Sequence, residues 1–132
     1  MKENKHIVLV EDDDDDIFLL KTAFEELNML DKVQLFRNGQ DALVYLQNQS
    51  EPPSFVISDL NMPVMNGFEL LDELLKKNFF VNGNPQFVFL TTSEKSMIPS
   101  HSFGESQFSF FTKGYSYNQM KDTLSIITTG KA

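Results

Sequence analysis

Residues 7–16 read IVLVEDDDDD, a run of four aliphatic residues followed directly by six acidic ones. A continuous apolar run of this length is typical of a central parallel strand, because such a strand is covered on both faces and its side chains need not alternate. The six acids are nearly a third of the nineteen in the chain, so the negative charge is concentrated at one point. The stretch therefore predicts a buried strand that ends in an acidic loop at one edge of a sheet.

The rest of the chain alternates between helical and extended patterns. From about Asp14 the apolar residues recur at helical spacing, as Ile17, Leu20, Phe24 and Leu27. Acidic residues in the first turn of this helix are favoured by the helix dipole. Further strands are predicted at 33–36, 55–57, 87–90 and 108–111. Further helices are predicted to begin at Asn38, Asn66 and Ser116, the last two with the capping partners Glu69 and Gln119.

Strands and helices that alternate over short connections predict an α/β fold, a doubly wound five-stranded parallel sheet with right-handed crossovers. In the helix that begins at Asn66, Phe68, Leu71 and Leu75 are expected to face the sheet. The 132 residues have room for one such domain, so residues 1–132 are expected to form a single domain with no output domain. Functional side chains in sheets of this kind gather at the carboxyl ends of the strands.

The composition excludes several classes of function. Cysteine is absent, which excludes disulfides, thiolate metal sites and cysteine nucleophiles. The formal net charge is -8, and the Lys and Arg residues are scattered, so we expect no binding to nucleic acid. The longest apolar runs are only about four residues, so neither a secretory signal nor a membrane-spanning helix is expected. These features predict a cytoplasmic protein with no membrane partner.

Five chemically complementary residues lie at the ends of the predicted strands. They are Glu11 and Asp12 after the first strand, Asp59 after the third, Thr91 after the fourth and Lys113 after the fifth. Three crowded carboxylates raise one another's pKa and destabilise a fold unless a cation neutralises them, and clustered oxygens suit Mg2+. One Mg2+ ion and Lys113 match the three carboxylates in charge, so the resting pocket is expected to be near neutral.

An ionised Asp59 in such a pocket can act as an oxygen nucleophile on phosphorus. The metal and Lys113 can then stabilise the equatorial oxygens of the phosphoryl group, and Thr91 can donate its hydroxyl to one of them. The predicted product is an aspartyl phosphate at Asp59. The acids of residues 13–16 are interpreted instead as a loop and a solvated first helical turn without a catalytic role.

Five short motifs together resemble the response-regulator receiver family, of the chemotaxis-regulator type. They are Val10-Glu11-Asp12-Asp13, Ser58-Asp59-Leu60-Asn61-Met62-Pro63, Asn66-Gly67, Leu90-Thr91-Thr92 and Thr112-Lys113. A single acidic pair is a weak signal, but matched positions in the right order, each following a strand, are specific. The resemblance covers nearly the whole chain and implies a flavodoxin-like sheet of strand order 2-1-3-4-5.

The resemblance also implies a role for each matched residue. Asp59 is the implied phosphoacceptor, Asp12 a direct ligand of Mg2+, and Glu11 an acidic partner that acts through water. The backbone carbonyl of Asn61 is implied as a further ligand, while Thr91 and Lys113 hold the phosphate. Phe110 falls where such domains carry a switch aromatic, so Thr91 is expected to move toward the phosphate while the Phe110 ring turns inward.

Two features depart from the family pattern. Gly114 follows the lysine where receivers usually have a proline in a cis bond, so this loop is expected to be more flexible. Residues 93–107 should hold the fourth helix but contain Pro99, Gly104 and several serines, so an irregular fourth helix is expected. Because receivers often signal through that face, a short or mobile signalling face is expected.

The first functional hypothesis is a stand-alone receiver, monomeric or weakly homodimeric. It takes phosphate from a histidine kinase or phosphotransfer protein, catalyses only its own modification, and signals to an unknown downstream protein. An alternative is a receiver-fold binding module that signals without phosphate. A third is a phosphohydrolase with an aspartate nucleophile, but Asn61 stands where those enzymes need a second Asp, and an amide cannot act as general acid and base.

Overall fold

The computed structural model describes residues 6–80, 85–92, 108–114 and 116–129. Its five strands are β1 (Ile7–Val10), β2 (Val33–Phe36), β3 (Phe55–Ser58), β4 (Gln86–Thr91) and β5 (Ser109–Thr112). Its helices are α1 (Asp14–Glu26), the short 3-10 helix η1 (Leu30–Lys32), α2 (Gly39–Gln47), α3 (Gly67–Lys76) and α4 (Tyr117–Thr129).

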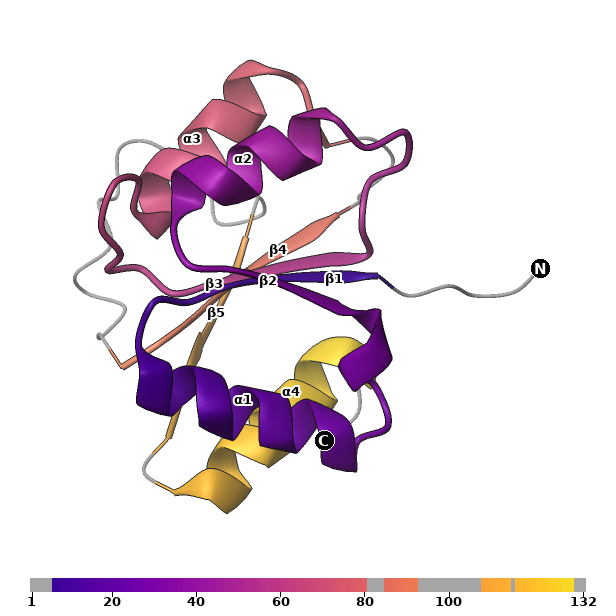
Figure 1. Ribbon diagram of the computed structural model, residues 1–132, viewed down its shortest axis with the longest axis vertical. Coiled ribbons are helices and arrows are strands. Elements are labelled where there is room, and N and C mark those ends of the chain that lie inside the picture. The colour runs from indigo at the N-terminus through magenta and orange to yellow at the C-terminus, as the bar shows by residue number, and fades with distance from the viewer. Residues whose placement is uncertain (1–5, 81–84, 93–107, 115, 130–132) are drawn as a thin grey trace.

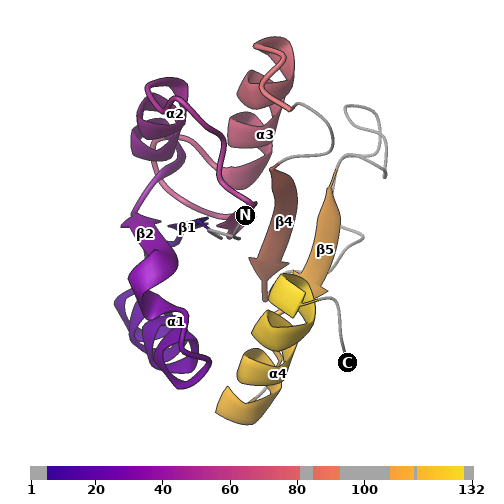
Figure 2. The same ribbon diagram turned by 90° about the vertical axis from the view of Figure 1, so that its right-hand side faces the viewer.

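The strands form one parallel sheet in the order β2-β1-β3-β4-β5, which confirms the predicted architecture. Figures 1 and 2 show the sheet between two layers, with α2 and α3 on one face and α1 and α4 on the other. Val10 of β1 is in register with Ser58 of β3, and Ser58 with Phe89 of β4. The carboxyl ends of these central strands therefore meet at one edge, where the acidic loop begins.

Each face of the sheet carries its own hydrophobic core. Ile7, Leu9 and Ile57 pack with α1 and α4, whereas Val8, Val10 and Val56 pack with α2 and α3. Successive residues of a strand point to opposite faces, and here both faces are covered. All four residues of β1 are buried as a result, as the unbroken apolar run predicts.

The helix starts follow the capping signals in the sequence. Asn66 accepts a hydrogen bond from the Glu69 amide, and the Glu69 side chain accepts one from the Asn66 amide, which completes the predicted capping box of α3. Asp13 caps α1 through the Asp16 amide. These caps satisfy backbone N–H groups that the first turn of a helix leaves without a partner.

Some details differ from the sequence predictions. The face of α3 that is buried carries Leu70, Leu71 and Leu74, while Phe68 and Leu75 are only partly buried. Strand β4 is longer by one residue at each end, so Thr91 is its last residue instead of following it. Strand β5 begins and ends one residue later than predicted. The expected irregular fourth helix lies outside the described residues.

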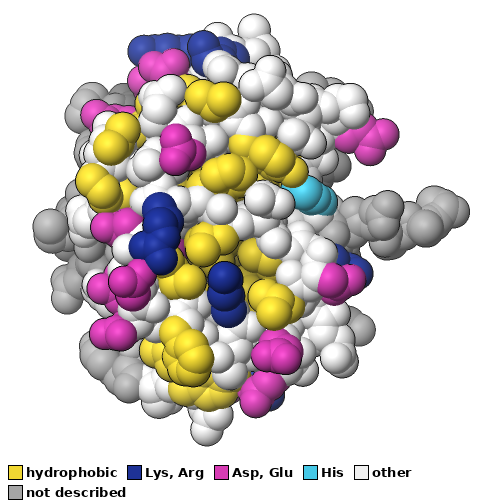
Figure 3. All heavy atoms as spheres, viewed as in Figure 1, with side chains coloured by type: hydrophobic (Ala, Val, Ile, Leu, Met, Phe, Trp, Pro, Cys, Tyr) yellow, Lys and Arg dark blue, Asp and Glu magenta, His cyan; other side chains and the backbone are white. Residues whose placement is uncertain are grey.

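Figure 3 shows acidic, basic and hydrophobic side chains interspersed on one face of the molecule, without a continuous basic stripe. None of the described helices could span a membrane.

Candidate functional site

The carboxyl edge of the sheet brings the residues predicted from the strand ends to one place. Glu11 and Asp12 follow β1, Asp59 follows β3, and Lys113 follows β5. The Asp59 amide donates to the Val10 carbonyl over 3.0 Å, and the Lys113 amide donates to the Thr91 carbonyl over 2.9 Å. The sheet pairing thus continues one residue past the strands and fixes the backbone of both residues.

Glu11, Asp12 and Asp59 form an acidic cluster in which each offers a carboxylate oxygen within 4.8 Å of the others. Oxygen ligands gathered this closely are the donor set that Mg2+ and similar hard cations prefer. Glu11 is buried, and Asp12 and Asp59 are half-buried, so their mutual repulsion is only partly screened by water. The residues present therefore fit a divalent cation.

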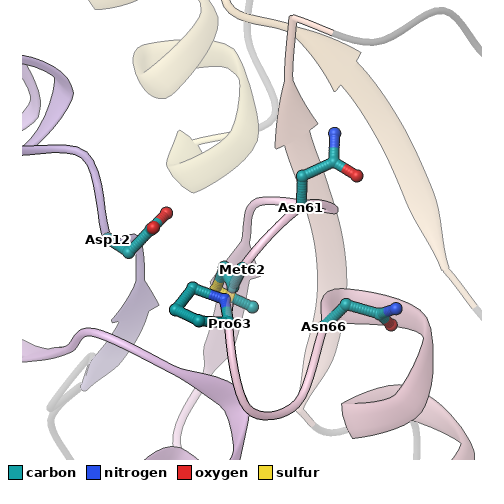
Figure 4. A pocket seen from close by; sticks show the side chains of 5 residues that line it. All are labelled: Asp12, Asn61, Met62, Pro63 and Asn66. Carbon is teal, nitrogen blue, oxygen red and sulfur yellow. The ribbon is translucent and has the colours of Figure 1, made fainter.

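A shallow pocket beside this cluster is lined by Asp12 and by the loop residues Asn61, Met62, Pro63 and Asn66. Figure 4 shows Asp12 projecting toward the loop that carries Met62 and Pro63, while the side chain of Asn61 extends away from it.

The ammonium group of Lys113 lies among three carboxylates. Its Nζ is 2.8 Å from Glu11 Oε1, 2.6 Å from Asp16 Oδ2 and 3.5 Å from Asp59 Oδ2. The Lys113 side chain is only 3% exposed and that of Glu11 only 1%. A buried lysine is stable in a fold only when anions accept its hydrogen bonds, and here the acids of two other segments do so.

Burial and charge act in opposite directions on the ionisation of this pair. Burial raises the pKa of Glu11 to about 7, even though the hydrogen bond and charge of Lys113 lower it. Burial alone would lower the pKa of Lys113, but hydrogen bonds to Asp16 and Glu11 outweigh it and raise that pKa above its ordinary value. The lysine is therefore held charged, while Glu11 ionises near neutral pH.

The two oxygens of Asp59 are in different environments. Oδ1 accepts a hydrogen bond of 2.7 Å from the Leu60 amide, and Oδ2 faces Lys113. The Asp59 side chain is 13% exposed, so it can be reached from solvent. An oriented carboxylate beside a buried cation, open on one side, is suited to nucleophilic attack on an incoming electrophile.

Asp16 is a residue of this site that the sequence interpretation missed. A place in the first turn of a helix predicts a solvated side chain, but the Asp16 carboxylate makes the shortest contact to Lys113. Helical spacing could not link it to Asp12, because Asp12 precedes the N-cap of α1. Asp16 therefore adds a third carboxylate, beside those of Glu11 and Asp59, to the surroundings of the Lys113 ammonium.

The two predicted switch residues lie on the face of the sheet that α3 covers. Thr91 is fully buried at the end of β4. Phe110 of β5 is in register with Phe89 of β4 and is partly buried against the core on that side. Phe110 is therefore partly exposed, whereas Thr91 on the neighbouring strand is fully buried.

Glycines allow the backbone to pass closely around the site. Gly114 has φ 81°, a left-handed conformation that glycine adopts without strain. A Cβ on Gly67 would lie 2.4 Å from the Asp59 carbonyl oxygen. The start of α3 therefore packs directly on the backbone of the candidate nucleophile.

Known proteins with similar sequences include response regulators. Residues 7–125 match the model of the response regulator receiver domain. The chain is 30% identical over 125 residues to the probable methanogenesis regulatory protein FilR2 of Methanothrix harundinacea, covering 92% of this chain and 79% of that protein. It is 34% identical over 104 residues to response regulator Rcp1 of Synechocystis sp., covering 74% and 69% respectively.

Solved structures of related regulators share the fold. The phosphorylated cyanobacterial phytochrome response regulator RcpA superposes with a TM-score of 0.79 at 25% identity, over 97% of this chain and 96% of that one. The Mn(2+)-bound form of Rcp1 superposes with a TM-score of 0.72 at 27% identity, over 96% and 94%. The acidic edge, its buried lysine and these matches lead to one conclusion, that the chain belongs to the response regulator receiver domain family.

Proposed function

We propose that Asp59 accepts a phosphoryl group and that the chain is a phosphoacceptor switch of a two-component phosphorelay. The observation that carries this proposal is the convergence of Asp59 with Glu11 and Asp12 within 4.8 Å, with the Lys113 ammonium 3.5 Å from Asp59. Members of the family are regulatory proteins and not turnover enzymes, in keeping with a pocket that modifies its own aspartate.

In the proposed reaction Asp59 Oδ2, or Oδ1 after release from the Leu60 amide, attacks the phosphorus of a phosphohistidine. The new O–P bond forms as the P–N bond breaks, and the electron pair of that bond goes to the imidazole, which then takes up a proton. Lys113 donates to an oxygen of the transferred group, and Thr91 offers its hydroxyl to another. The product is an aspartyl phosphate.

A divalent cation in this pocket would be held by Glu11, Asp12, Asp59 and the main-chain carbonyl of Asn61. When bound, Mg2+ supplies positive charge that neutralises the oxygens of the transferred group. Rcp1, a relative, has been solved in an Mn(2+)-bound form, which supports a divalent cation at this edge. Glu11 and Asp12 in turn need that charge, because the carboxylates repel one another.

The proposed output of the switch is a change at the Phe110 face. Thr91 is buried and Phe110 only partly buried on the same side of the sheet, so a shift of Thr91 toward the phosphate opens space for the ring. Turning the ring inward changes the surface that a downstream protein meets. The proposed donor is a histidine kinase or phosphotransfer protein of the cytoplasm.

Incubation with phosphoramidate and Mg2+ tests this function. We expect the intact mass to rise by one phosphoryl group, and neutral hydroxylamine to remove it, as it does from an acyl phosphate. Leaving out Mg2+ and adding a chelator should slow the labelling at least about tenfold, because the metal would supply most of the positive charge that stabilises the transferred phosphoryl group. An unchanged mass, in a reaction where a control receiver is labelled, would contradict the proposal.

The raised pKa of Glu11 predicts that metal binding depends on pH. Its pKa of about 7 lies above the ordinary 4.5, so neutral Glu11 stabilises the metal-free fold below pH 4.5, and that contribution is lost as the pH rises through about 7. Ionised Glu11 is also the form that helps to hold a cation. The increase in Tm caused by Mg2+ should therefore be larger at about pH 8 than at about pH 6.

Thermal unfolding followed by circular dichroism, with and without Mg2+, measures this difference. The control is Glu11→Gln, in which the Mg2+-dependent increase in Tm should be smaller and nearly independent of pH. Equal increases at both pH values in the unsubstituted protein would contradict the prediction.

A further inference from the structure

Asp16 occupies the third position of α1, where a carboxylate usually turns back to the helix cap. Its backbone amide donates to the Asp13 side chain, but its own carboxylate leaves the helix and contacts Lys113. The distance from Lys113 Nζ to Asp16 is 2.6 Å, against 2.8 Å to Glu11 and 3.5 Å to Asp59. The ammonium is thus nearest to the acid that the phosphoryl reaction does not use.

We propose that Asp16 is a positioning residue that competes with the phosphoryl group for Lys113 and thereby limits how readily the pocket is phosphorylated. This inference rests on the proposed function of Asp59. An ammonium has three N–H donors, and each is directed to a carboxylate in this structure. A phosphoryl group on Asp59 can gain a full hydrogen bond from Lys113 only if the contact with Asp16 weakens.

Glu11 makes Asp16 unnecessary for holding the lysine in place. The Glu11 side chain is more deeply buried than that of Asp16, which is 28% exposed, and it already contacts the ammonium at 2.8 Å. What Asp16 adds is a further negative charge in direct contact with the ammonium. That charge cancels part of the positive field that would attract a phosphodonor.

Removing the charge of Asp16 should therefore favour phosphorylation. We expect Asp16→Asn to lower the phosphoramidate concentration that gives half of the maximal labelling rate by about tenfold, an effect reduced by the partial exposure of Asp16 to water. Asp16→Glu, which keeps the charge within reach of Lys113, should behave like the unsubstituted protein.

Asp15→Asn is the matched control. Asp15 belongs to the same first turn of α1, but it is exposed. Its substitution removes the same charge from the same end of the helix. Both substitutions lose the same favourable interaction with the helix dipole. The labelling curve of Asp15→Asn should stay within about twofold of that of the unsubstituted protein.

A second measurement uses the metal-free protein and needs no phosphoryl transfer. If Asp16 acts through Lys113, the Tm changes of Asp16→Asn and Lys113→Met should be clearly non-additive in the double variant. The Tm changes of Asp15→Asn and Lys113→Met should add. This comparison distinguishes a direct contact with the lysine from a general effect on the helix.

The outcomes separate this inference from the proposed function. If the unsubstituted protein is labelled, and Asp16→Asn but not Asp15→Asn reaches half of its maximal labelling rate at a lower phosphoramidate concentration, both the proposed function and the role of Asp16 are supported. Labelling with identical or right-shifted curves for Asp16→Asn overturns the role of Asp16 and leaves the phosphoacceptor intact, as do additive Tm changes. An unsubstituted protein that takes no phosphoryl group overturns both.

Discussion

Replacing Lys113 with methionine should lower the free energy of unfolding by about 3 to 5 kcal/mol at pH 8, the usual cost of removing one partner of a buried ion pair. The lysine is buried against Glu11, and both side chains are almost inaccessible to water. Without the ammonium, Glu11, Asp16 and Asp59 lose a common hydrogen-bond donor and repel one another. Methionine fills a similar volume, so the loss measures charge more than packing.

The loss of unfolding free energy caused by Lys113→Met should become smaller as the pH falls. Because the pKa of Glu11 is already raised to about 7, Glu11 takes up a proton below that pH and no longer needs a buried counter-charge. Urea unfolding at about pH 8 and about pH 6 measures both effects. The double variant Lys113→Met with Glu11→Gln should recover part of the stability at pH 8.

Lys76→Met is the control for a lysine in an ion pair at the surface. Lys76 lies 3.2 Å from Asp72 in α3, but its side chain is 65% exposed. Exposed pairs contribute little, so this change should alter the free energy of unfolding by less than about 1 kcal/mol. If Lys113→Met were no more destabilising than Lys76→Met, Lys113 would not be the central cation of the pocket.

Gly67→Ala is expected to destabilise the fold by about 2 kcal/mol and to slow phosphorylation of Asp59. Alanine is the better helix former by about 1 kcal/mol in a helix interior, so propensity at this first residue of α3 predicts at most that gain. The new Cβ, however, would lie 2.4 Å from the Asp59 carbonyl oxygen and 3.0 Å from the Phe89 ring. The nearer obstacle is backbone at the end of β3 and cannot rotate away, so steric overlap outweighs propensity.

Urea unfolding and phosphoramidate labelling of the same variant measure the two effects. Gly114→Asn is the contrasting glycine substitution, because asparagine tolerates a left-handed backbone and the nearest obstacle there is the side chain of Gln119. It should cost less stability than Gly67→Ala. A Gly67→Ala protein as stable and as reactive as the parent would show that α3 does not press on the backbone of Asp59.

Most of the fold could be predicted because local signals agree with it. The apolar run Ile7–Val10 specifies a strand buried on both faces, and the Asn66 and Glu69 pair specifies where α3 begins. The inward face of α3 could not be chosen by periodicity, because Phe68, Leu70, Leu71, Leu74 and Leu75 offer two overlapping apolar stripes. Packing against β3 and β4 decides between them, and that packing depends on residues distant in sequence.

The candidate site could be predicted to the extent that it follows strand ends. Parallel strands bring their carboxyl ends to one edge, so Glu11, Asp12, Asp59 and Lys113 could be grouped before their distances were known. Asp16 could not be grouped with them, since a first-turn acid is stabilised by the helix dipole whether or not it reaches a cation. The close approach of Gly67 to Asp59 likewise depends on a tertiary contact.

Locating the phosphoryl group on the chain decides whether Asp59 is the phosphoacceptor. After incubation with phosphoramidate and Mg2+, reduction with borohydride converts an aspartyl phosphate to homoserine, which peptide mapping by mass spectrometry can assign to a position. We expect homoserine at position 59 in the unsubstituted protein and in the surface control Asp72→Asn, and no labelling of Asp59→Asn. Homoserine at another acid, or undiminished labelling of Asp59→Asn, would contradict it.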